Sequence, residues 1–358
     1  MNTSMLNSPK SNYKDNLDYY DHYLALDWSQ ESVALARMTQ KSPRIKVVEW
    51  RKSNLKELKE HLFSLKGKKI LTIEETTSSH WLYVELTDVV DRIVICDPYY
   101  NHLLSDGPKT DKYDAMKLCS LLRGGFLKEV FHSCDRLYHL RHLLSAYEDL
   151  VKAGVRVQNQ RSALYRARGM RYSKCDKTEH QALLSHPGHY KIIIDWQESM
   201  IEKYREDKAA FEAEIKKIVN GQSAVKNIMA LPGIGYINAF KILAVVIQPQ
   251  RFAKKGSYLS YCGLVWLEKS SGNKNYGKRR PRYNRLLKEV YKNAAYTAIQ
   301  GGHNPVYEYY QTLIAKGLTD KQAHQMVSRY LAKVSLSMLK NGRKYEPYRW
   351  RKDEITAA

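Results

Sequence analysis

The sequence has few cysteines, no long apolar run and a shortage of acidic residues. Its five cysteines are scattered and form no Cys-x-x-Cys pair, so neither a disulfide framework nor a zinc site is indicated. No apolar stretch approaches the roughly 20 residues that a membrane-spanning helix needs. The polar residues 1–16 lack the apolar core of a signal peptide. We therefore expect a cytoplasmic protein with no membrane partner.

The charge balance points to a polyanionic partner. Lys and Arg number 59 against 37 Asp and Glu, a net charge of +22, and nucleic acid is the usual partner of so basic a chain. A basic ribosomal-type or membrane-surface protein would explain the charge, but not the carboxylates described below. With 358 residues, the chain is long enough for two domains.

The first third of the chain predicts an α/β domain over residues 21–136, after a disordered leader at 1–20. Short apolar runs of strand length alternate with segments of helical spacing, which is the pattern of a sheet covered by helices. The expected strands are 23–27, 32–38, 45–50, 69–74 and 92–96, and the expected helices are 55–65, 80–86 and 111–122.

The rest of the chain predicts mainly helix. Over residues 137–225 apolar residues recur at spacings of three and four residues, among many charged residues. This pattern indicates two or more long helices in an antiparallel pair or coiled-coil arm, broken near 185–190. Residues 226–342 are expected to form a mainly α C-terminal domain. Residues 343–358 are expected to be a tail that lies on the surface.

Four carboxylates are candidate metal ligands. Asp27 and Glu74 each end an apolar strand, where a carboxylate is costly unless it is solvated, hydrogen-bonded or bound to a cation. Asp111 and Asp114 are three residues apart and so share one face of the expected helix. If all four gather at one edge of a sheet, they would bind Mg²⁺ or Mn²⁺ through oxygen.

Each of these acids, taken singly, has an ordinary structural interpretation. Asp is common at strand ends and at helix starts, and periodicity alone does not show that the four side chains converge. Glu75 and Asp97 are rival ligands on the same grounds.

A Gly-rich turn at residues 231–243 is similar to the helix-hairpin-helix turn of DNA-binding proteins. Gly233 and Gly235 would permit close backbone approach, and the helix after them would offer unpaired N–H groups to a phosphate. A tight turn between two helices, with no ligand, is the competing interpretation. Contact of this kind would bind the DNA backbone without reading bases.

A possible nucleophile lies beside a dense basic cluster. Ser270 and Ser271 precede Gly272, and between Arg251 and Gln300 there are 12 Lys and Arg against two Glu. A nucleophilic serine needs an activating base or metal and cations to hold the phosphate, and no nearby His supplies the base. The cations expected to contact nucleic acid are Lys274, Lys278, Arg279, Arg280, Arg282 and Arg285.

These blocks together resemble the DEDD transposases of insertion sequences, the IS110 group related to the Piv invertase and described as bridge-RNA-guided recombinases. The resemblance rests on LALDWS at 24–29, IEETT at 73–77 and KTDKYDA at 109–115, followed by LPGIG, YCGLV and the Ser-Gly pair in the family's order. The sequence departs from the family at Thr77, where Gly is frequent, and around Pro281.

The resemblance implies a RuvC-like (RNase H-like) N-terminal domain in which Asp27, Glu74, Asp111 and Asp114 bind metal. It implies Ser271 as the nucleophile, with Ser270 as the fallback, and a covalent phosphoserine–DNA intermediate. Donor and target double-stranded DNA, a structured guide RNA and a homo-oligomer, dimer or tetramer, are the implied partners.

Two other functions stay open on the sequence alone. A metal-dependent, junction-resolving nuclease would use water as the nucleophile and leave Ser271 structural. An inactive nucleic-acid-binding scaffold would keep the basic surface without chemistry, although the intact set of four acids argues against it.

Overall fold

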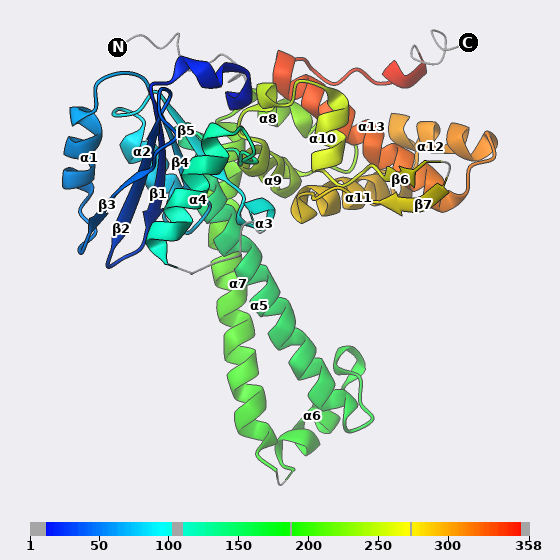
Figure 1. The fold of residues 1–358 in the computed structure, drawn as a ribbon. Coiled ribbons are helices and arrows are strands. Elements are labelled where there is room, and N and C mark those ends of the chain that lie inside the picture. The colour runs from blue at the N-terminus through cyan, green and yellow to red at the C-terminus, as the bar shows by residue number, and fades with distance from the viewer. Residues whose placement is uncertain (1–11, 102–109, 187, 273, 352–358) are drawn as a thin grey trace. The chain divides into compact units, whose positions relative to one another are not determined.

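The computed structural model describes residues 12–101, 110–186, 188–272 and 274–351, which form two compact units. The first unit ends at Asp135 and the second begins at Arg136. Figure 1 shows the elements and their labels.

The first unit is built on a five-stranded mixed sheet of order β3-β2-β1-β4-β5. β1 pairs antiparallel with β2 and parallel with β4; β2–β3 is antiparallel and β4–β5 is parallel. The strands are β1 (His22–Trp28), β2 (Val33–Thr39), β3 (Lys46–Trp50), β4 (Lys69–Glu74) and β5 (Arg92–Cys96). All five lie where the sequence predicted them, within one or two residues. This mixed α/β unit is compatible with the expected RuvC-like class.

Alternation along the strands gives the sheet two buried faces. In β1, Leu24 and Leu26 belong to one core cluster, together with leucines of α1 (Leu55–Ser64) and α2 (Ser79–Leu86). Tyr23 and Ala25 belong to the other cluster, with the inner face of α4 (Asp111–Arg123). A side-chain period of two produces this division. Figure 1 shows α1 and α4 on opposite sides of the sheet.

The expected disordered leader at residues 1–20 is wrong for residues 13–19, which have regular structure. Residues 1–11 lie outside the described residues, but Tyr13–Tyr19 form a 3-10 helix, η2. Tyr13 is buried and its hydroxyl donates to the Leu127 carbonyl oxygen at 2.8 Å. The polar sequence of this stretch hides two buried tyrosines, Tyr13 and Tyr20, which tie it to the α4 face of the sheet.

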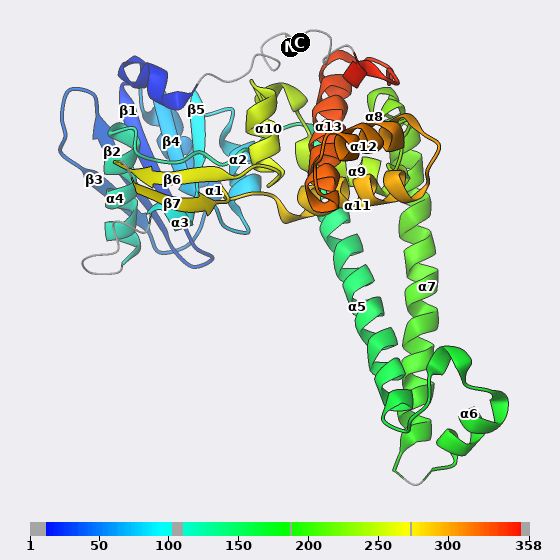
Figure 2. The same cartoon turned by 90° about the vertical axis from the view of Figure 1, so that its right-hand side faces the viewer.

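The second unit begins with a long helical hairpin, as the spacing predicted. α5 (Leu140–Arg166) and α7 (Tyr190–Asn220) run side by side, and α6 (Lys177–Leu184) lies between them in sequence, at the far end of the hairpin (Figure 2). Asp176 and Glu179 form a capping box at the start of α6. Ile215 and Val219 of α7 join the main core of this unit, so the base of the hairpin is packed rather than free.

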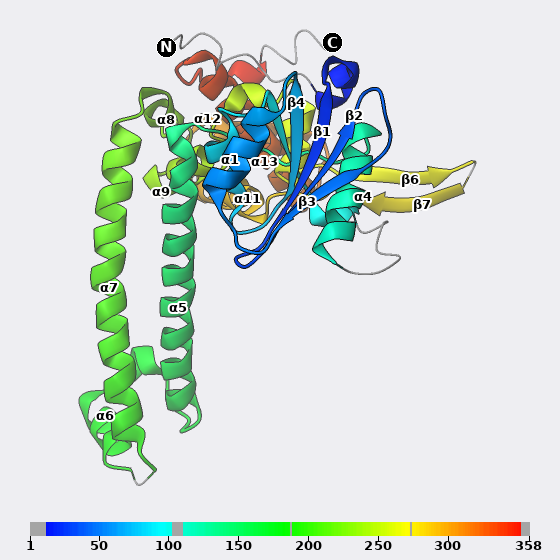
Figure 3. The same ribbon diagram turned by 60° about the vertical axis from the view of Figure 1, so that its left-hand side comes forward.

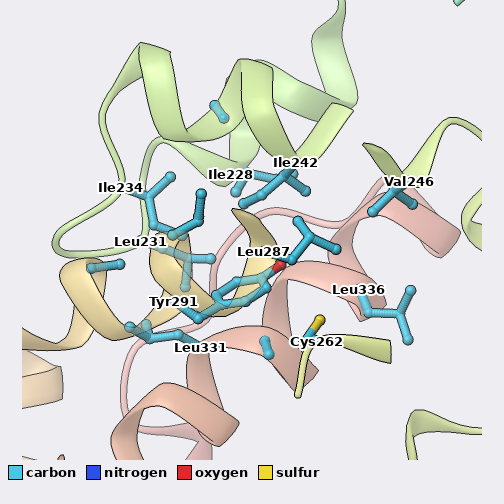
Figure 4. Close-up of a cluster of buried hydrophobic side chains, with 14 of the residues drawn as sticks. Ile228, Leu231, Ile234, Ile242, Val246, Cys262, Leu287, Tyr291, Leu331 and Leu336 are labelled. Carbon is cyan, nitrogen blue, oxygen red and sulfur yellow. The ribbon is translucent and has the colours of Figure 1, made fainter. Parts of the chain in front are cut away.

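The main core of the second unit is formed by helices of the C-terminal region. Figure 4 shows Leu231, Ile242, Leu287 and Leu331 converging around Tyr291. The helices are α8 (Ser223–Ile228), α9 (Tyr236–Val246), α10 (Lys255–Tyr261), α11 (Arg285–Gln300), α12 (Pro305–Ala315) and α13 (Asp320–Asn341). The mainly helical expectation therefore holds for this region, with one exception.

The exception is a two-stranded ribbon that the sequence did not reveal. β6 (Leu267–Ser271) and β7 (Lys274–Arg279) pair antiparallel, with an irregularity between Glu268 and Ser270, and every described residue of both strands is exposed (Figure 3). Strands that bury neither face show no apolar alternation, and this is why the pattern gave no strand signal here.

The expected surface tail is also partly buried. Trp350 is only 6% exposed and lies with its ring centroid 5.4 Å from that of Tyr309 in α12. Tyr348 and Arg351 both bond to Glu308, at 3.1 and 2.7 Å. The polar composition of 343–358 concealed one aromatic anchor, and residues 352–358 lie outside the described part of the chain. Among the described residues, no helix is long and apolar enough to cross a membrane.

Candidate catalytic site and nucleic-acid interface

Asp27 and Glu74 lie side by side at the carboxyl ends of neighbouring parallel strands. The β1–β4 register pairs Leu26 with Ile73, and the next residues in each strand are Asp27 and Glu74. Both follow the alternation of the residues that face α4, Ala25 in β1 and Ile70 in β4. The backbone therefore presents the two carboxylates on one face at one edge of the sheet.

The first turn of α4 brings the other two acids to the same edge. Thr110 caps the helix, its hydroxyl oxygen accepting from the Tyr113 N–H at 3.4 Å. Asp111 accepts a 2.8 Å hydrogen bond from the Ser32 hydroxyl, in the turn between β1 and β2. Because that turn follows directly on the carboxyl end of β1, this bond ties the start of α4 to the edge where Asp27 lies.

Sequence reasoning missed Ser32 as a positioning residue. The turn is held together by the Ser29 hydroxyl, which accepts from the Ser32 N–H at 2.9 Å and bonds to its carbonyl and hydroxyl oxygens. Ser53 also donates to the Ser29 carbonyl oxygen, at 2.7 Å. Serines that flank a strand end beside a candidate acid were the only signal in the sequence, and such serines usually mark turns.

The electrostatics of the edge show that the acids interact. Burial, together with the charges of Asp111, Asp114 and Glu74, raises the pKa of Asp27 to about 6. Like charges that disfavour one another's ionised form in this way favour the binding of a cation. The four predicted residues are thus brought together in one electrostatic cluster.

The four acids offer suitable donor atoms for a metal ion, but their side chains are not close enough together to surround one. Four carboxylates are the oxygen ligands that Mg²⁺ and Mn²⁺ take. Within the described part of the chain, however, no three His, Cys, Asp or Glu side chains lie close enough to form a ready metal site. An Asp114 carboxylate oxygen also lies 4.0 Å from the Lys117 Nζ, in a long ion pair. The chemistry of the donors fits a divalent ion, and the side chains as placed are spread more widely than its ligands would be.

The rival ligands have other environments. Asp97 is buried and accepts a 3.1 Å hydrogen bond from the Tyr99 N–H at the start of α3 (Pro98–Asn101), as a helix cap does. Glu75 is exposed, and by alternation it points away from Glu74. Neither residue is among the charges that raise the pKa of Asp27.

Ser270 and Ser271 lie on the exposed ribbon and point to opposite faces of it. Ser271 pairs with Lys274, and Ser270 pairs with Asn275. Paired residues share a face and successive residues alternate, but β7 carries one extra residue between Asn275 and Lys278, because Glu268 pairs with Lys278. Ser271 is therefore on the face of Lys274 and, through the Leu267–Arg279 pair, of Arg279. Ser270 is on the other face, with Asn275 and Lys278. Within the described residues, the Ser271 side chain makes no hydrogen bond.

The predicted basic cluster is fully displayed on and beside this ribbon. The Arg280 guanidinium lies 4.1 Å from the centre of the Trp266 ring, and Lys269 is 6.0 Å from that of Tyr276. A basic, two-stranded ribbon with aromatic side chains suits contact with a groove and its phosphates. Exposed cations here are Lys274, Lys278, Arg279, Arg280, Arg282 and Arg285.

Arg251 does not belong to this exposed cluster. Its guanidinium donates to the carbonyl oxygens of Val245 and Val246, both at 3.2 Å, at the end of α9. Burial lowers its pKa. A cation that satisfies the last carbonyls of a helix has a capping role.

The two glycines of the predicted turn differ in what they do. Gly233 has a φ of +82°, and a Cβ there would collide with the Ala294 carbonyl oxygen of α11. Gly235 precedes α9 with a φ of −86°, and a Cβ there would meet nothing within 4 Å. Close backbone approach at Gly233 is therefore to the protein itself, whereas Gly235 leaves space at the helix start.

Segments of both units are similar to transposase family models. Residues 24–166 match the family model DEDD_Tnp_IS110, described as transposase, and residues 225–311 match the Transposase IS116/IS110/IS902 family. The chain is 29% identical over 161 residues to the insertion element IS110 uncharacterized 43.6 kDa protein of Streptomyces coelicolor, covering 44% of this chain and 39% of that protein.

A second relative agrees. The insertion element IS116 uncharacterized 44.8 kDa protein of Streptomyces clavuligerus is 27% identical over 137 residues, 38% of this chain and 34% of its own length. The matched region thus spans less than half the length of either curated relative. Both relatives are proteins of insertion elements, and each is similar to only part of this chain.

Proposed function

We infer that the chain is a DEDD transposase of the IS110/IS116 family, and from this premise we propose that it cleaves and rejoins DNA to move its own insertion sequence. The observation that carries the proposal is the convergence of Asp27, Glu74, Asp111 and Asp114 at one edge of the β1–β4 sheet. A transposase that acts through acidic residues needs such an edge. The basic surface of the second unit would bind the phosphates of the DNA backbone.

The four carboxylates would hold Mg²⁺ or Mn²⁺. Such an ion, when bound, polarises a phosphodiester and offsets the charge that develops on its oxygens. The chain's own part is to fix the donors. The paired strands orient Asp27 and Glu74, and the Ser32 hydroxyl orients Asp111 through its 2.8 Å bond.

Ser271 would be the nucleophile of strand cleavage. Its oxygen forms a bond to phosphorus while the bond to the leaving deoxyribose oxygen breaks; the serine proton passes to a base, and the leaving oxygen takes up a proton. A strand hydroxyl then attacks the phosphoserine, which rejoins DNA and restores the serine. Lys274 and Arg279 share the ribbon face of Ser271 and would hold the phosphate.

The base and the remaining partners come from outside the ribbon. Because Ser271 has no hydrogen-bond partner among the described residues, we propose that it is activated by the acidic edge of the same chain or of another copy in a dimer or tetramer. Donor and target double-stranded DNA would be the substrates. A structured RNA would guide the choice of site.

A water-using nuclease is the second candidate, because the acids lie together in one unit and need no serine to assemble. In that case Ser271 would be dispensable for cleavage. Replacement of this serine by alanine distinguishes the two candidates, because only the serine mechanism loses cleavage with the hydroxyl.

The proposed cleavage is tested with Asp27→Asn against the matched charge removal Glu75→Gln. On DNA carrying the element's ends, with Mg²⁺ and RNA from its flanks, Asp27→Asn should lower the cleavage rate by about a thousandfold, since it removes a donor that stabilises transition-state charge. Glu75→Gln should cleave like wild type. Calorimetric titration with Mn²⁺ provides a second measurement: Asp27→Asn should bind more weakly. Equal rates in both variants would contradict the site.

A further inference from the structure

A basic cavity in the second unit is lined by described residues that belong neither to the ribbon nor to the four acids. It has a volume of about 370 Å³ and lies among α10, α12, α13 and residues 343–350. This is the size range of cavities that bind small organic ligands. The proposed cleavage chemistry does not use it.

The cavity is lined by an excess of positive charge. Lys316, Arg329 and Lys333 come from the end of α12 and from α13. The segment after α13 adds Arg343, Lys344 and Arg349, and α10 adds Lys255. Among the described lining residues Glu346 is the only carboxylate, 3.9 Å from Arg349. So many cations in one concavity repel one another, and a bound polyanion would offset that repulsion.

Several of these cations are available to a ligand. Within the described residues, Lys255, Lys333, Arg343 and Lys344 make no ion pair or side-chain hydrogen bond, and all four are exposed. Arg329 differs, because its Nε donates to the Leu264 carbonyl oxygen at 2.7 Å. The first four are therefore the groups that an incoming phosphate would meet.

Aromatic rings form one wall of the cavity. The ring centroids of Tyr309 and Tyr330 are 5.1 Å apart, and those of Tyr309 and Trp350 are 5.4 Å apart. The Trp350 indole is buried, and its N–H has no hydrogen-bond partner among the described residues. A buried N–H without a partner costs free energy, which a bound acceptor could recover.

The C-terminal segment is fastened at this wall. Tyr348 and Arg351 reach Glu308 on α12, at 3.1 and 2.7 Å, on either side of Trp350. The Arg351 guanidinium also lies 5.2 Å from the Trp350 ring centre. The wall is thus built by specific contacts rather than by a loosely laid tail.

We propose that this cavity binds one nucleotide of a single-stranded nucleic acid, with the phosphate among the free cations and the base against the aromatic wall. Cations beside aromatic rings are the combination that holds unpaired strands. A duplex keeps its bases stacked inside and cannot place one in a concavity without extruding it. The site is independent of the proposed cleavage chemistry, so its test measures binding alone.

The test compares Lys333→Gln/Arg343→Gln with the control Lys216→Gln/Lys226→Gln, which removes two exposed cations of the same unit outside the cavity lining. Probes are short labelled single strands of RNA and of DNA, and a DNA duplex. The cavity pair should lose about tenfold in affinity for a single strand, whereas the control should lose no more than about twofold. If the cavity pair loses more affinity for RNA than for single-stranded DNA, the nucleotide comes from RNA; the reverse result identifies DNA.

A spectroscopic readout checks the cavity itself. In an NMR spectrum of protein whose six tryptophans are labelled at the indole nitrogen, the Trp350 signal is the one that Trp350→Phe lacks. This signal should shift when the single strand is added to wild type. Circular dichroism and thermal unfolding of each variant establish that it is folded.

Three outcomes would overturn the proposal. These are equal single-strand affinities of the cavity and control pairs, an unmoved Trp350 signal at saturation, or a larger loss for the duplex than for the single strand. Displacement of the strand by an acidic peptide, with no shift of Trp350, would instead mean a protein partner bound by charge. None of these results depends on whether Ser271 or water attacks DNA.

Discussion

The acidic edge and the serine ribbon differ in how far the fold fixes them. At the edge, Asp27 and Glu74 follow paired strands, and Asp111 is held by Ser32. On the ribbon, Ser270 and Ser271 belong to two exposed strands whose residues bury neither face. One half of the candidate machinery is therefore positioned by packing and hydrogen bonds, and the other is presented to solvent.

This difference has a physical consequence. Side chains that packing holds are positioned before a ligand arrives, but changing them also changes stability. A ribbon that contributes little to the core is free to order on nucleic acid, and changing it should alter binding while leaving stability unchanged. Substitutions in packed and in exposed positions test this contrast.

The largest effect is expected at Gly233 of the packed turn. Gly233→Ala should lower the free energy of unfolding by more than about 3 kcal/mol, because φ is +82° and the new Cβ would lie against the Ala294 carbonyl oxygen. Denaturant unfolding measures it.

Gly235→Ala is the matched control. Its φ is −86° and its Cβ would enter open space, so its stability should stay within about 0.5 kcal/mol of wild type. A weaker affinity for DNA in this stable variant would mean that phosphate approaches the start of α9. Equal costs for the two glycines would contradict the division between a packed and an open position.

The second effect concerns pH and Asp27. Its folded pKa is about 6 against an ordinary 3.8, so between these values the native chain keeps a proton that the unfolded chain has lost. The contribution of this group to stability therefore falls as pH rises from about 4 to about 6 and stays low above. In chelator at pH 7, Asp27→Asn should raise the free energy of unfolding by about 1–2 kcal/mol, after allowance for solvent screening.

Near pH 4, where Asp27 of wild type is protonated, Asp27→Asn should not raise the free energy of unfolding. Glu31→Gln, which removes an exposed charge, provides the comparison and should leave the free energy of unfolding within about 0.5 kcal/mol of wild type. If Asp27→Asn gains equally at both pH values, then side-chain packing rather than charge explains its effect.

A third, smaller effect is expected on the ribbon. Lys274→Gln/Arg279→Gln removes two cations from the face of Ser271, so the slope of log affinity for duplex DNA against log salt should become shallower by up to about 1.8, or about 0.9 for each phosphate that is no longer neutralised. Thermal unfolding should be unchanged because both side chains are exposed. A fall in melting temperature with an unaltered slope would reverse the assignment.

The sequence predicted the packed region better than the exposed one. Strand-length apolar runs located all five strands of the first unit, because burial on two faces leaves a strong pattern. The sheet order was not accessible from that pattern, and neither was the bond from Ser32 to Asp111, which joins residues 79 apart in the chain. Convergence of the four acids was a hypothesis from resemblance, and the register and electrostatics now support it.

The exposed region left little pattern to interpret. The segments LEKSS and KNYGKR bury nothing, and their pairing was missed for that reason. The cavity beside Trp350 was missed because a polar, basic tail is usually solvated. Composition therefore predicted neither the strand pairing of the ribbon nor the burial of Trp350.

The most direct test of the account is covalent trapping of DNA on the ribbon. Ser271→Ala and Ser270→Ala should both unfold within about 0.5 kcal/mol of wild type, since both side chains are exposed. On element-end DNA with Mg²⁺ and flanking RNA, we predict a protease-sensitive protein–DNA adduct on a denaturing gel for wild type and Ser270→Ala, and none for Ser271→Ala. Cleavage without an adduct, persisting in Ser271→Ala, would contradict the serine mechanism and identify water as the nucleophile at the acidic edge.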